Sequence, residues 1–332
     1  IIDRPLLISE IAKNSNNPFS PPPYLSGIDG NFEEPVKNFQ HYCENTIFFA
    51  EAIPNLNISF GPDIVAYFVK GAGENVRVES DTAWIEPFVE KWEDFGKIEI
   101  DRENQWYKKF MDFYKYASDK GEGEFLIQMP DLHTHLDLLR AIRGTSNLCI
   151  DLIEKTDLIE KHLEETKGIF LDIYTGIYNS TNMKTWGTTC WIPLYSDKKY
   201  CTIQCDFICM IGPEMFRKFA LPYIEYEANF LDCSIFHLDG PGALRHLDDL
   251  LSIKKINAIQ WVPGAGEKPH IFWIELLKKI KKAGKGVIVY PQSIEEIEIF
   301  HKELGPEKVV YQFNFKNFKE AEKVKNYLIK HT

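Results

Sequence analysis

The second half of the chain alternates between short apolar runs and longer segments whose apolar residues recur at helical spacing. Apolar or β-branched runs lie at 189–194, 200–208, 234–238, 258–262, 286–290 and 309–313. Helical patterns follow most of them, at 213–230, 243–251, 271–283, 294–304 and 315–329. Alternation of this kind predicts parallel strands covered by helices, in either a closed barrel or an open doubly wound sheet.

Polar and aromatic residues at the ends of these runs favour the barrel. Asp239, Trp261, Tyr290 and Gln312 each stand at or near the end of an apolar run. In a (β/α)8 barrel many strands contribute to one rim, and that rim carries the chemistry. None of the runs is followed by a glycine-rich phosphate fingerprint, so a dinucleotide-binding fold is disfavoured. We therefore predict an α/β chain with the TIM-barrel architecture.

The first half of the chain is less regular. A strand is expected at 124–129 and helices at 104–118 and 151–174, while 55–60 and 76–85 are candidates for early strands. Three consecutive prolines within 14–23 indicate an extended arm. We accordingly divide the chain into an N-terminal arm with a leading helix, 1–45, and one barrel domain, 46–332.

Length, charge and cysteine content narrow the range of functions. With 332 residues, of which 44% are hydrophobic, the chain can bury a large core. A net charge of -11 supplies no basic face for phosphates, which argues against nucleic-acid binding. No apolar run is long enough to span a membrane, and seven cysteines without a disulfide-like framework suit a reducing cytoplasm. We predict a cytoplasmic protein.

The most informative candidate site lies at 234–242. An apolar run there changes to His237 and Asp239 and then breaks at Gly-Pro-Gly. Residues two apart on a strand point the same way, so the imidazole and the carboxylate share one face. At the carboxyl end of a strand such a pair serves catalysis or a metal ion. The alternative is a turn in which both side chains satisfy backbone groups.

Two further groups of residues are candidates for the same rim. His133 and His135, preceded by Asp131, are interpreted either as metal-type ligands or as members of a hydrogen-bonded loop. Asp206 falls on the polar face of the run at 200–208. The cysteines of that region recur every four residues, fit no iron–sulfur signature and are interpreted as reduced core residues: Cys201, Cys205 and Cys209.

Four segments of the chain carry a family resemblance. The sequence GPEMFRKFALPY at 212–223, followed by IFHLDG at 235–240, AIQW at 258–261 and LGP at 304–306, resembles the uroporphyrinogen decarboxylase superfamily. That superfamily joins porphyrinogen decarboxylases to the methyltransferases that serve corrinoid proteins. The resemblance extends from residue 148 to the end of the chain. It implies a (β/α)8 barrel of the uroporphyrinogen decarboxylase type, with a deep cleft at the carboxyl ends of the strands.

The decarboxylase branch of this resemblance fits the chain poorly. Its members hold substrate carboxylates with an N-terminal arginine loop, of which only Arg4 is present here. The serine and the later histidine of the family fall on Asp206 and Pro241. A carboxylate is electrostatically wrong for a polycarboxylate porphyrinogen, so we expect no authentic uroporphyrinogen decarboxylation.

The methyltransferase branch fits in part. Its members hold zinc through a His-x-Cys pair at this strand end and a later cysteine. His237 matches, but Asp239 replaces the cysteine and no cysteine follows Cys233. Thiolate ligation is therefore lost, whereas an imidazole and a carboxylate suit a harder metal.

These observations favour methyl transfer that involves a corrinoid protein or a tetrahydropterin. His237, Asp239 and Asp206 are the expected catalytic residues, and the first two are the expected ligands of a divalent metal, zinc or iron. Substrate-binding residues are expected among the other strand-end groups: Asp131, His133, His135, Gln260, Trp261, Tyr290 and Gln312.

Two alternatives remain open. One is decarboxylase or lyase chemistry on a substrate smaller than a porphyrinogen, with Asp206 or Asp239 as general acid. The other is a ligand-binding barrel without catalysis. The expected partners are a small-molecule substrate and a corrinoid protein, and a homodimer is left open.

Overall fold

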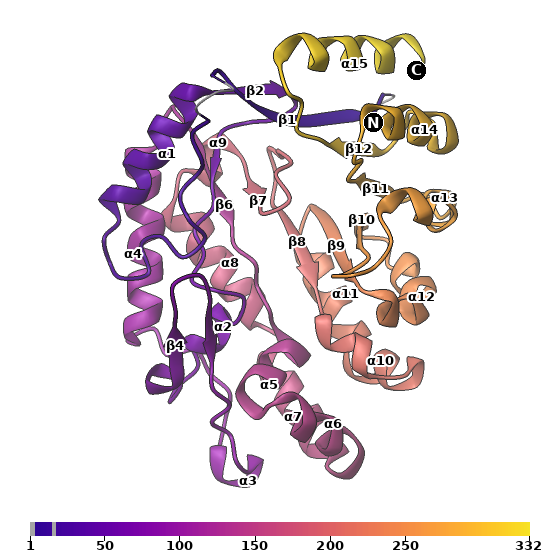
Figure 1. Ribbon diagram of the computed structural model, residues 1–332. Helices are drawn as coiled ribbons and strands as arrows, with labels where there is room; N and C mark the ends of the chain where they lie inside the picture. The colour runs from indigo at the N-terminus through magenta and orange to yellow at the C-terminus, as the bar shows by residue number, and fades with distance from the viewer. Residues whose placement is uncertain (1–3, 15–17) are drawn as a thin grey trace.

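The fold is built on parallel strands, most of which are followed by helices (Figure 1). The structure is a computed structural model that describes residues 4–14 and 18–332. Within those residues the larger sheet has seven strands in the order β2-β1-β12-β11-β10-β9-β8. All neighbours in it are parallel except β2, which pairs antiparallel with β1. Its strands are β1 Leu6–Ala12, β2 Thr46–Ala50, β8 Tyr200–Gln204, β9 Cys233–Asp239, β10 Ile256–Val262, β11 Gly286–Val289 and β12 Val309–Gln312.

A second parallel sheet, in the order β3-β6-β7, stands beside the first (Figure 1). Its strands are short: β3 Asn55–Leu56, β6 Leu126–Met129 and β7 Thr189–Cys190. Side chains link its β7 edge to β8, since Cys190 Sγ lies 3.1 Å from Thr202 Oγ1 and the Tyr200 amide donates to Thr188 Oγ1 at 3.1 Å. A separate antiparallel pair consists of β4 Val76–Val78 and β5 Ala83–Ile85.

The helices cover the outer side of these sheets. In Figure 1, α1 and α4 lie outside β6, whereas α12, α13 and α14 lie outside β9, β10 and β11. The α-helices are α1 Glu33–Asn45, α2 Ile64–Tyr67, α3 Trp92–Phe95, α4 Gln105–Lys120, α5 His135–Arg143, α6 Thr145–Glu154, α7 Thr156–Thr166, α8 Ile169–Ser180, α9 Met183–Trp186, α10 Pro213–Phe219, α11 Leu221–Phe230, α12 Leu247–Ser252, α13 Ile274–Lys282, α14 Ile294–Leu304 and α15 Phe318–Lys330. The described residues also form 3-10 helices: η1 Gly73–Asn75, η2 Asp206–Met210, η3 Pro241–His246 and η4 His270–Trp273.

Local sequence signals set several of these boundaries. The side chains of Asn104, Ser293 and Asn317 accept backbone N–H groups in the first turns of α4, α14 and α15. Such caps satisfy amide donors that have no partner inside the helix. Gly305 ends α14 with a φ of 71°, a conformation that residues with a Cβ rarely adopt.

The alternation expected for the second half of the chain is confirmed, and the mixed α/β fold with parallel sheets is shown. Complete closure into a (β/α)8 barrel stays a prediction. Among the described residues no hydrogen-bonded ladder joins the two sheets. The candidate early strand at 76–85 is instead a hairpin of its own, in which Val76–Val78 pairs with Ala83–Ile85.

The N-terminal arm was expected to precede the barrel, and for one segment this is wrong. Leu6–Ala12 forms β1 and pairs with β12, so that Leu7 faces Tyr311 from the other end of the chain. Burial explains the placement, because Leu7, Ile8 and Ile11 are each 4% exposed or less. Residues 15–17 of the expected arm lie outside the described part of the chain. Among the described residues no helix has the length and apolar character needed to cross a membrane.

Candidate functional site

Strand β9 presents His237 and Asp239 on the inner face of the larger sheet. Alternation along the strand turns Phe236 and Leu238, both 0% exposed, to the opposite face. His237 and Asp239 stay partly exposed, as expected for side chains that border a cleft. The prediction that these two side chains point to the same face of the strand is therefore confirmed.

Neighbouring strands add two glutamines beside the histidine. His237 is paired in register with Gln204 on β8 and with Gln260 on β10. Parallel partners point to the same face, so these three polar side chains form one row across the sheet. Both glutamines are nearly buried, at 3% and 4% exposure, so each amide needs a partner within the protein.

Gln260 determines which nitrogen of His237 is free. Its Oε1 lies 2.6 Å from His237 Nδ1, and its Nε2 donates to the Tyr290 hydroxyl at 2.5 Å. An amide oxygen can only accept, so Nδ1 donates to it, and in the neutral imidazole Nε2 is the nitrogen with the lone pair. Burial raises the pKa of Tyr290 to about 12, which keeps the hydroxyl protonated at neutral pH.

Asp206 is held next to this row by a carboxylate from another helix. It starts η2, directly after β8 and Cys205. The backbone amides of Asp206 and Phe207 donate to the two oxygens of Asp137 on α5, each at 2.9 Å. Asp137 is 0% exposed and thus fixes the turn that carries Asp206. Nothing in the sequence pattern singled out Asp137 for this role.

The three predicted catalytic residues meet at the carboxyl ends of β8 and β9. Asp206, His237 and Asp239 each offer a ligand atom, and these atoms lie within 4.8 Å of one another. Oδ1 of Asp206 is buried and has no hydrogen-bond partner. Ligand atoms in a tetrahedral zinc site lie about 3.3 Å apart, so small side-chain movements would close the triad around an ion. Two carboxylates, one of them with an orphaned oxygen, and an imidazole nitrogen therefore fit a divalent metal.

The raised pKa of Asp206 indicates that its carboxylate lacks a compensating positive charge among the described residues. Burial raises the pKa of its carboxyl to about 6, and the neighbouring Asp137 adds to the increase. The opposing effects of His133 and His237 are smaller. A bound cation would reverse this balance by favouring the ionised form.

His133 lies between Asp131 and Asp137, the carboxylate that holds the turn of Asp206. Its Nε2 lies 3.1 Å from Asp131 Oδ2 and its Nδ1 lies 3.5 Å from Asp137 Oδ2. Burial alone would lower the pKa of His133, but the two carboxylates outweigh it and raise the pKa well above its usual value. Gln204 donates to the other oxygen of Asp131. Asp131 and His133 thus form a charged network behind the triad.

Two of the predicted substrate-binding residues lie elsewhere. Trp261 is 0% exposed and packs on Trp273, with ring centroids 4.9 Å apart, because it alternates with Gln260 onto the outer face. His135 is 1% exposed and lies 3.8 Å from Glu227 of α11. It does not share a face with His133, because the chain turns there into α5 and His135 adopts a φ of 40°.

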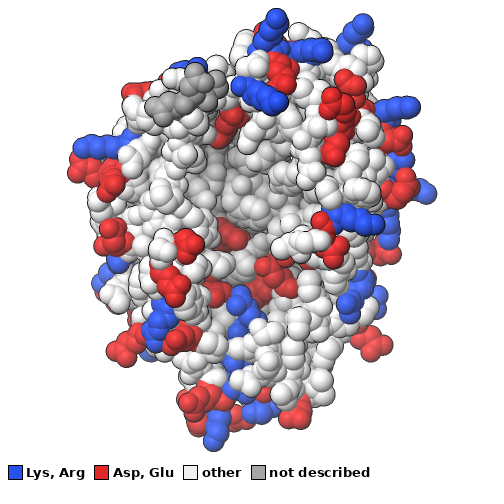
Figure 2. All heavy atoms as spheres, in the orientation of Figure 1, with Lys and Arg blue, Asp and Glu red and all other residues white. Residues whose placement is uncertain are grey.

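A hollow opens beside the triad, at the carboxyl ends of β1, β3 and β12. Figure 2 shows this face of the molecule hollowed at its centre, with acidic side chains around the hollow. The cavity measures about 390 Å³, and Gln312 and Trp191 line it. The Trp191 ring lies edge-on to His237, with centroids 5.1 Å apart, so the cavity and the triad share a wall.

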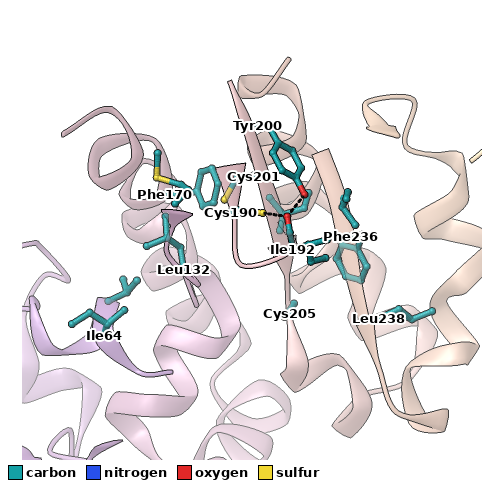
Figure 3. Close-up of a cluster of buried hydrophobic side chains, with 14 of the residues drawn as sticks. Ile64, Leu132, Phe170, Cys190, Ile192, Tyr200, Cys201, Cys205, Phe236 and Leu238 are labelled. Carbon is teal, nitrogen blue, oxygen red and sulfur yellow. Dashed lines mark hydrogen bonds between the residues drawn. The ribbon is translucent and has the colours of Figure 1, made fainter. Parts of the chain in front are cut away.

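Trp191 reaches this position because the segment between β7 and β8 is anchored inside the fold. The Ile192 carbonyl accepts the Tyr200 hydroxyl at 3.0 Å and the Cys190 thiol at 3.4 Å, as Figure 3 shows. The apolar run at 189–194 predicts a strand and does not single out Trp191, whereas only Thr189–Cys190 forms one. A single tryptophan in an apolar run carries no signal that separates it from core packing.

Behind the site, Glu227 is buried at 4% exposure and accepts a hydrogen bond from the Thr134 hydroxyl. Burial raises the pKa of its carboxyl to about 8. The folded pKa exceeds the unfolded one, so this contribution to stability is complete below the unfolded pKa and is lost as pH rises through 8. We expect the melting temperature to fall between about pH 5 and pH 8 and this decline to level off above pH 8.

Thermal melts across this pH range test the assignment. Glu227→Gln should flatten the decline, because a neutral amide has no proton to lose. Glu225→Gln removes an exposed carboxylate from the same helix and should leave the decline unchanged. Equal slopes for the parent and Glu227→Gln would contradict a neutral Glu227.

Comparisons with known proteins bear on the fold. No protein-family model matches the chain, and no curated protein matches its sequence. A solved structure, a methyltransferase from Methanosarcina mazei, is similar over 100% of this chain and 94% of that one, with a TM-score of 0.61. The two sequences are 12% identical, so the likeness concerns the fold.

Proposed function

We propose that this protein transfers a methyl group between a small substrate and a corrinoid carried by a partner protein, within the uroporphyrinogen decarboxylase superfamily. The observation that carries the proposal is the triad of Asp206, His237 and Asp239 at the carboxyl ends of two parallel strands. The carboxyl ends of barrel strands are the usual place for catalytic groups in this architecture. The fold likeness to a methyltransferase supports the same reading.

The chain's own residues would position the reacting groups. Gln260 and Tyr290 hold the His237 ring with Nε2 free, and Asp137 holds the turn that carries Asp206. A divalent metal on the triad would act as a Lewis acid on the heteroatom that gives or takes the methyl group. Oxygen and imidazole ligands favour a harder ion than a thiolate site does, so oxygen or nitrogen substrates suit it better than thiols.

A corrinoid is too large for the cavity of about 390 Å³, so the partner would present it at the cleft mouth. The small substrate would occupy the cavity beneath it. A tetrahydropterin is the alternative methyl carrier.

Metal analysis combined with a methyl-transfer assay tests the proposal. Protein purified without chelator should hold about one equivalent of zinc or iron per chain. With methylcobalamin as a soluble stand-in for the carried corrinoid, small alcohols or amines should cause protein-dependent loss of the cobalt–carbon absorbance, and small thiols should cause less. Chelation should stop this loss, and adding the metal back should restore it. Absence of both metal and conversion, with methyltetrahydropterin tried as well, would refute the proposal.

One observation favours the lyase alternative. Among the described residues Oδ1 of Asp206 has no hydrogen-bond partner, and burial raises the pKa of the carboxyl to about 6, which suits a general acid. In that case the triad would act without a metal, and carbon dioxide or an alkene would form from a small carboxylate. Metal-independent turnover of this kind would select the lyase over methyl transfer.

A further inference from the structure

The cavity beside the triad has a composition that suits one kind of ligand. It lies between the carboxyl ends of β1, β3, β6 and β12 and the segment that carries Pro21 and Pro22. Four aromatic rings contribute to its lining, from Tyr24, Phe39, Tyr42 and Trp191. Aromatic faces are electron-rich and attract cations, above all quaternary ammonium groups.

The lining carries one formal charge, and that charge is negative. Glu10 lines the cavity, and no lysine or arginine is among the described residues that do so. Its Oε2 accepts the Tyr42 hydroxyl at 2.5 Å, and within the described residues it has no ion-pair partner. Burial raises the pKa of the Glu10 carboxyl, with the Tyr42 hydrogen bond opposing. A partly buried carboxylate of this kind lacks the cation that normally compensates it.

The rest of the lining supplies neutral hydrogen-bonding groups. Gln312 and Asn314 extend from the end of β12, and Asn55 and Gln128 come from the smaller sheet. Gln128 donates to Asn55 across the cavity wall, so these two amides already satisfy each other in part. The lining thus offers a ligand aromatic faces, one carboxylate and amide groups. Among the described residues it has no positively charged side chain that could bind an anionic ligand.

We propose that this cavity binds a small cationic amine, with its ammonium group between Glu10 and the aromatic rings. This inference rests on the proposed function, because it makes the cavity the subsite for the small substrate. Trp191 lines the cavity and its ring lies edge-on to that of His237, so a second polar group on the amine would extend past this ring towards the triad. The substrate class is therefore an alkylated amine with a second oxygen or nitrogen function.

A matched pair of probes tests the proposal without any assumption about turnover. Choline and 3,3-dimethylbutan-1-ol have nearly the same shape, but only choline is charged. Isothermal titration should show choline binding at least about tenfold more tightly than the neutral alcohol, a difference of about 1.4 kcal/mol. Glu10→Gln keeps an acceptor for Tyr42 and should remove most of that preference. Glu322→Gln removes the same charge from an exposed position on α15 and should leave it intact.

The outcomes separate this inference from the proposed function. His237→Ala should leave the preference for choline over the neutral alcohol intact, because both probes carry the same hydroxyl and differ only in the charge that Glu10 and the aromatic rings would recognise. A protein that binds choline selectively but transfers no methyl group would keep the subsite and refute the methyl transfer. Equal binding of the two probes, binding of neither, or a preference for acetate over choline would overturn the subsite, whatever the methyl-transfer assay shows.

Discussion

Replacing His237 by alanine should abolish metal retention and turnover while leaving the fold almost as stable as that of the parent. The variant removes the one nitrogen ligand of the triad, whose Nε2 is left free by the contact between Nδ1 and Gln260. Loss of a group that only orients a ligand already costs 10- to 100-fold in metal affinity, so loss of a ligand itself should cost at least about 100-fold. His237 is partly exposed, so unfolding free energy should change by no more than about 1 to 2 kcal/mol.

Metal content after dialysis and thermal melting, measured on the same samples, check this expectation. Asp239→Asn should behave in the same direction, since an amide is a weaker ligand than a carboxylate. His41→Ala removes an exposed histidine from α1 and should change neither quantity. If His237→Ala and Asp239→Asn both bind and react like the parent, this strand end is a turn and the proposed site is wrong. A large loss of stability with metal binding intact would make His237 a structural residue.

Replacing Asp137 by alanine should have the largest effect on stability. Two backbone amides, those of Asp206 and Phe207, would lose their acceptor, and His133 would lose one of its two carboxylates. Unsatisfied buried donors cost about 1 to 3 kcal/mol each, and breaking a buried charge pair about 3 to 5 kcal/mol. We expect unfolding free energy to fall by about 3 to 5 kcal/mol.

Chemical denaturation with urea measures this loss. Asp112→Ala, which removes an exposed aspartate from α4, should stay within about 0.5 kcal/mol of the parent. Asp137→Asn keeps one acceptor oxygen and should fold, but with weaker metal binding because the turn that carries Asp206 is loosened. A fully stable Asp137→Ala variant would show that the turn is held by other contacts.

The pH dependence of the parent adds an independent check. Burial would raise the pKa of Asp137, but His133 and the Phe207 amide overcome it and lower the pKa to about 2. The folded pKa lies below the unfolded one, so this stabilisation is present above the unfolded pKa and is lost as pH falls towards 2. Asp137→Asn should lack that part of the acid transition.

The sequence by itself determined the second half of the fold and the core of the candidate site. Apolar runs alternating with helical patterns are a local signal, and each run from Tyr200 onwards contains a strand of the larger sheet, although the run at 200–208 leaves its strand after Gln204 and continues as η2. The pairing of His237 with Asp239 follows from the two-residue period of a strand, which holds whatever the strand packs against. Asp206 was identified in the same way, from its place on the polar face of its run.

Only the tertiary structure decided the rest, because the decisive contacts join segments that are distant in sequence. β1 lies in the sheet through pairing with β12, and β3 and β7 have two residues each, too few for any period to show. Asp137 acts on Asp206 from 69 residues away, and Trp191 reaches the cleft through the anchoring of Ile192. The predictions that His135 and Trp261 bind substrate are wrong, because each side chain points away from the cleft. Each has the right residue type near a strand end, but a turn or the alternation of the strand points it into the core.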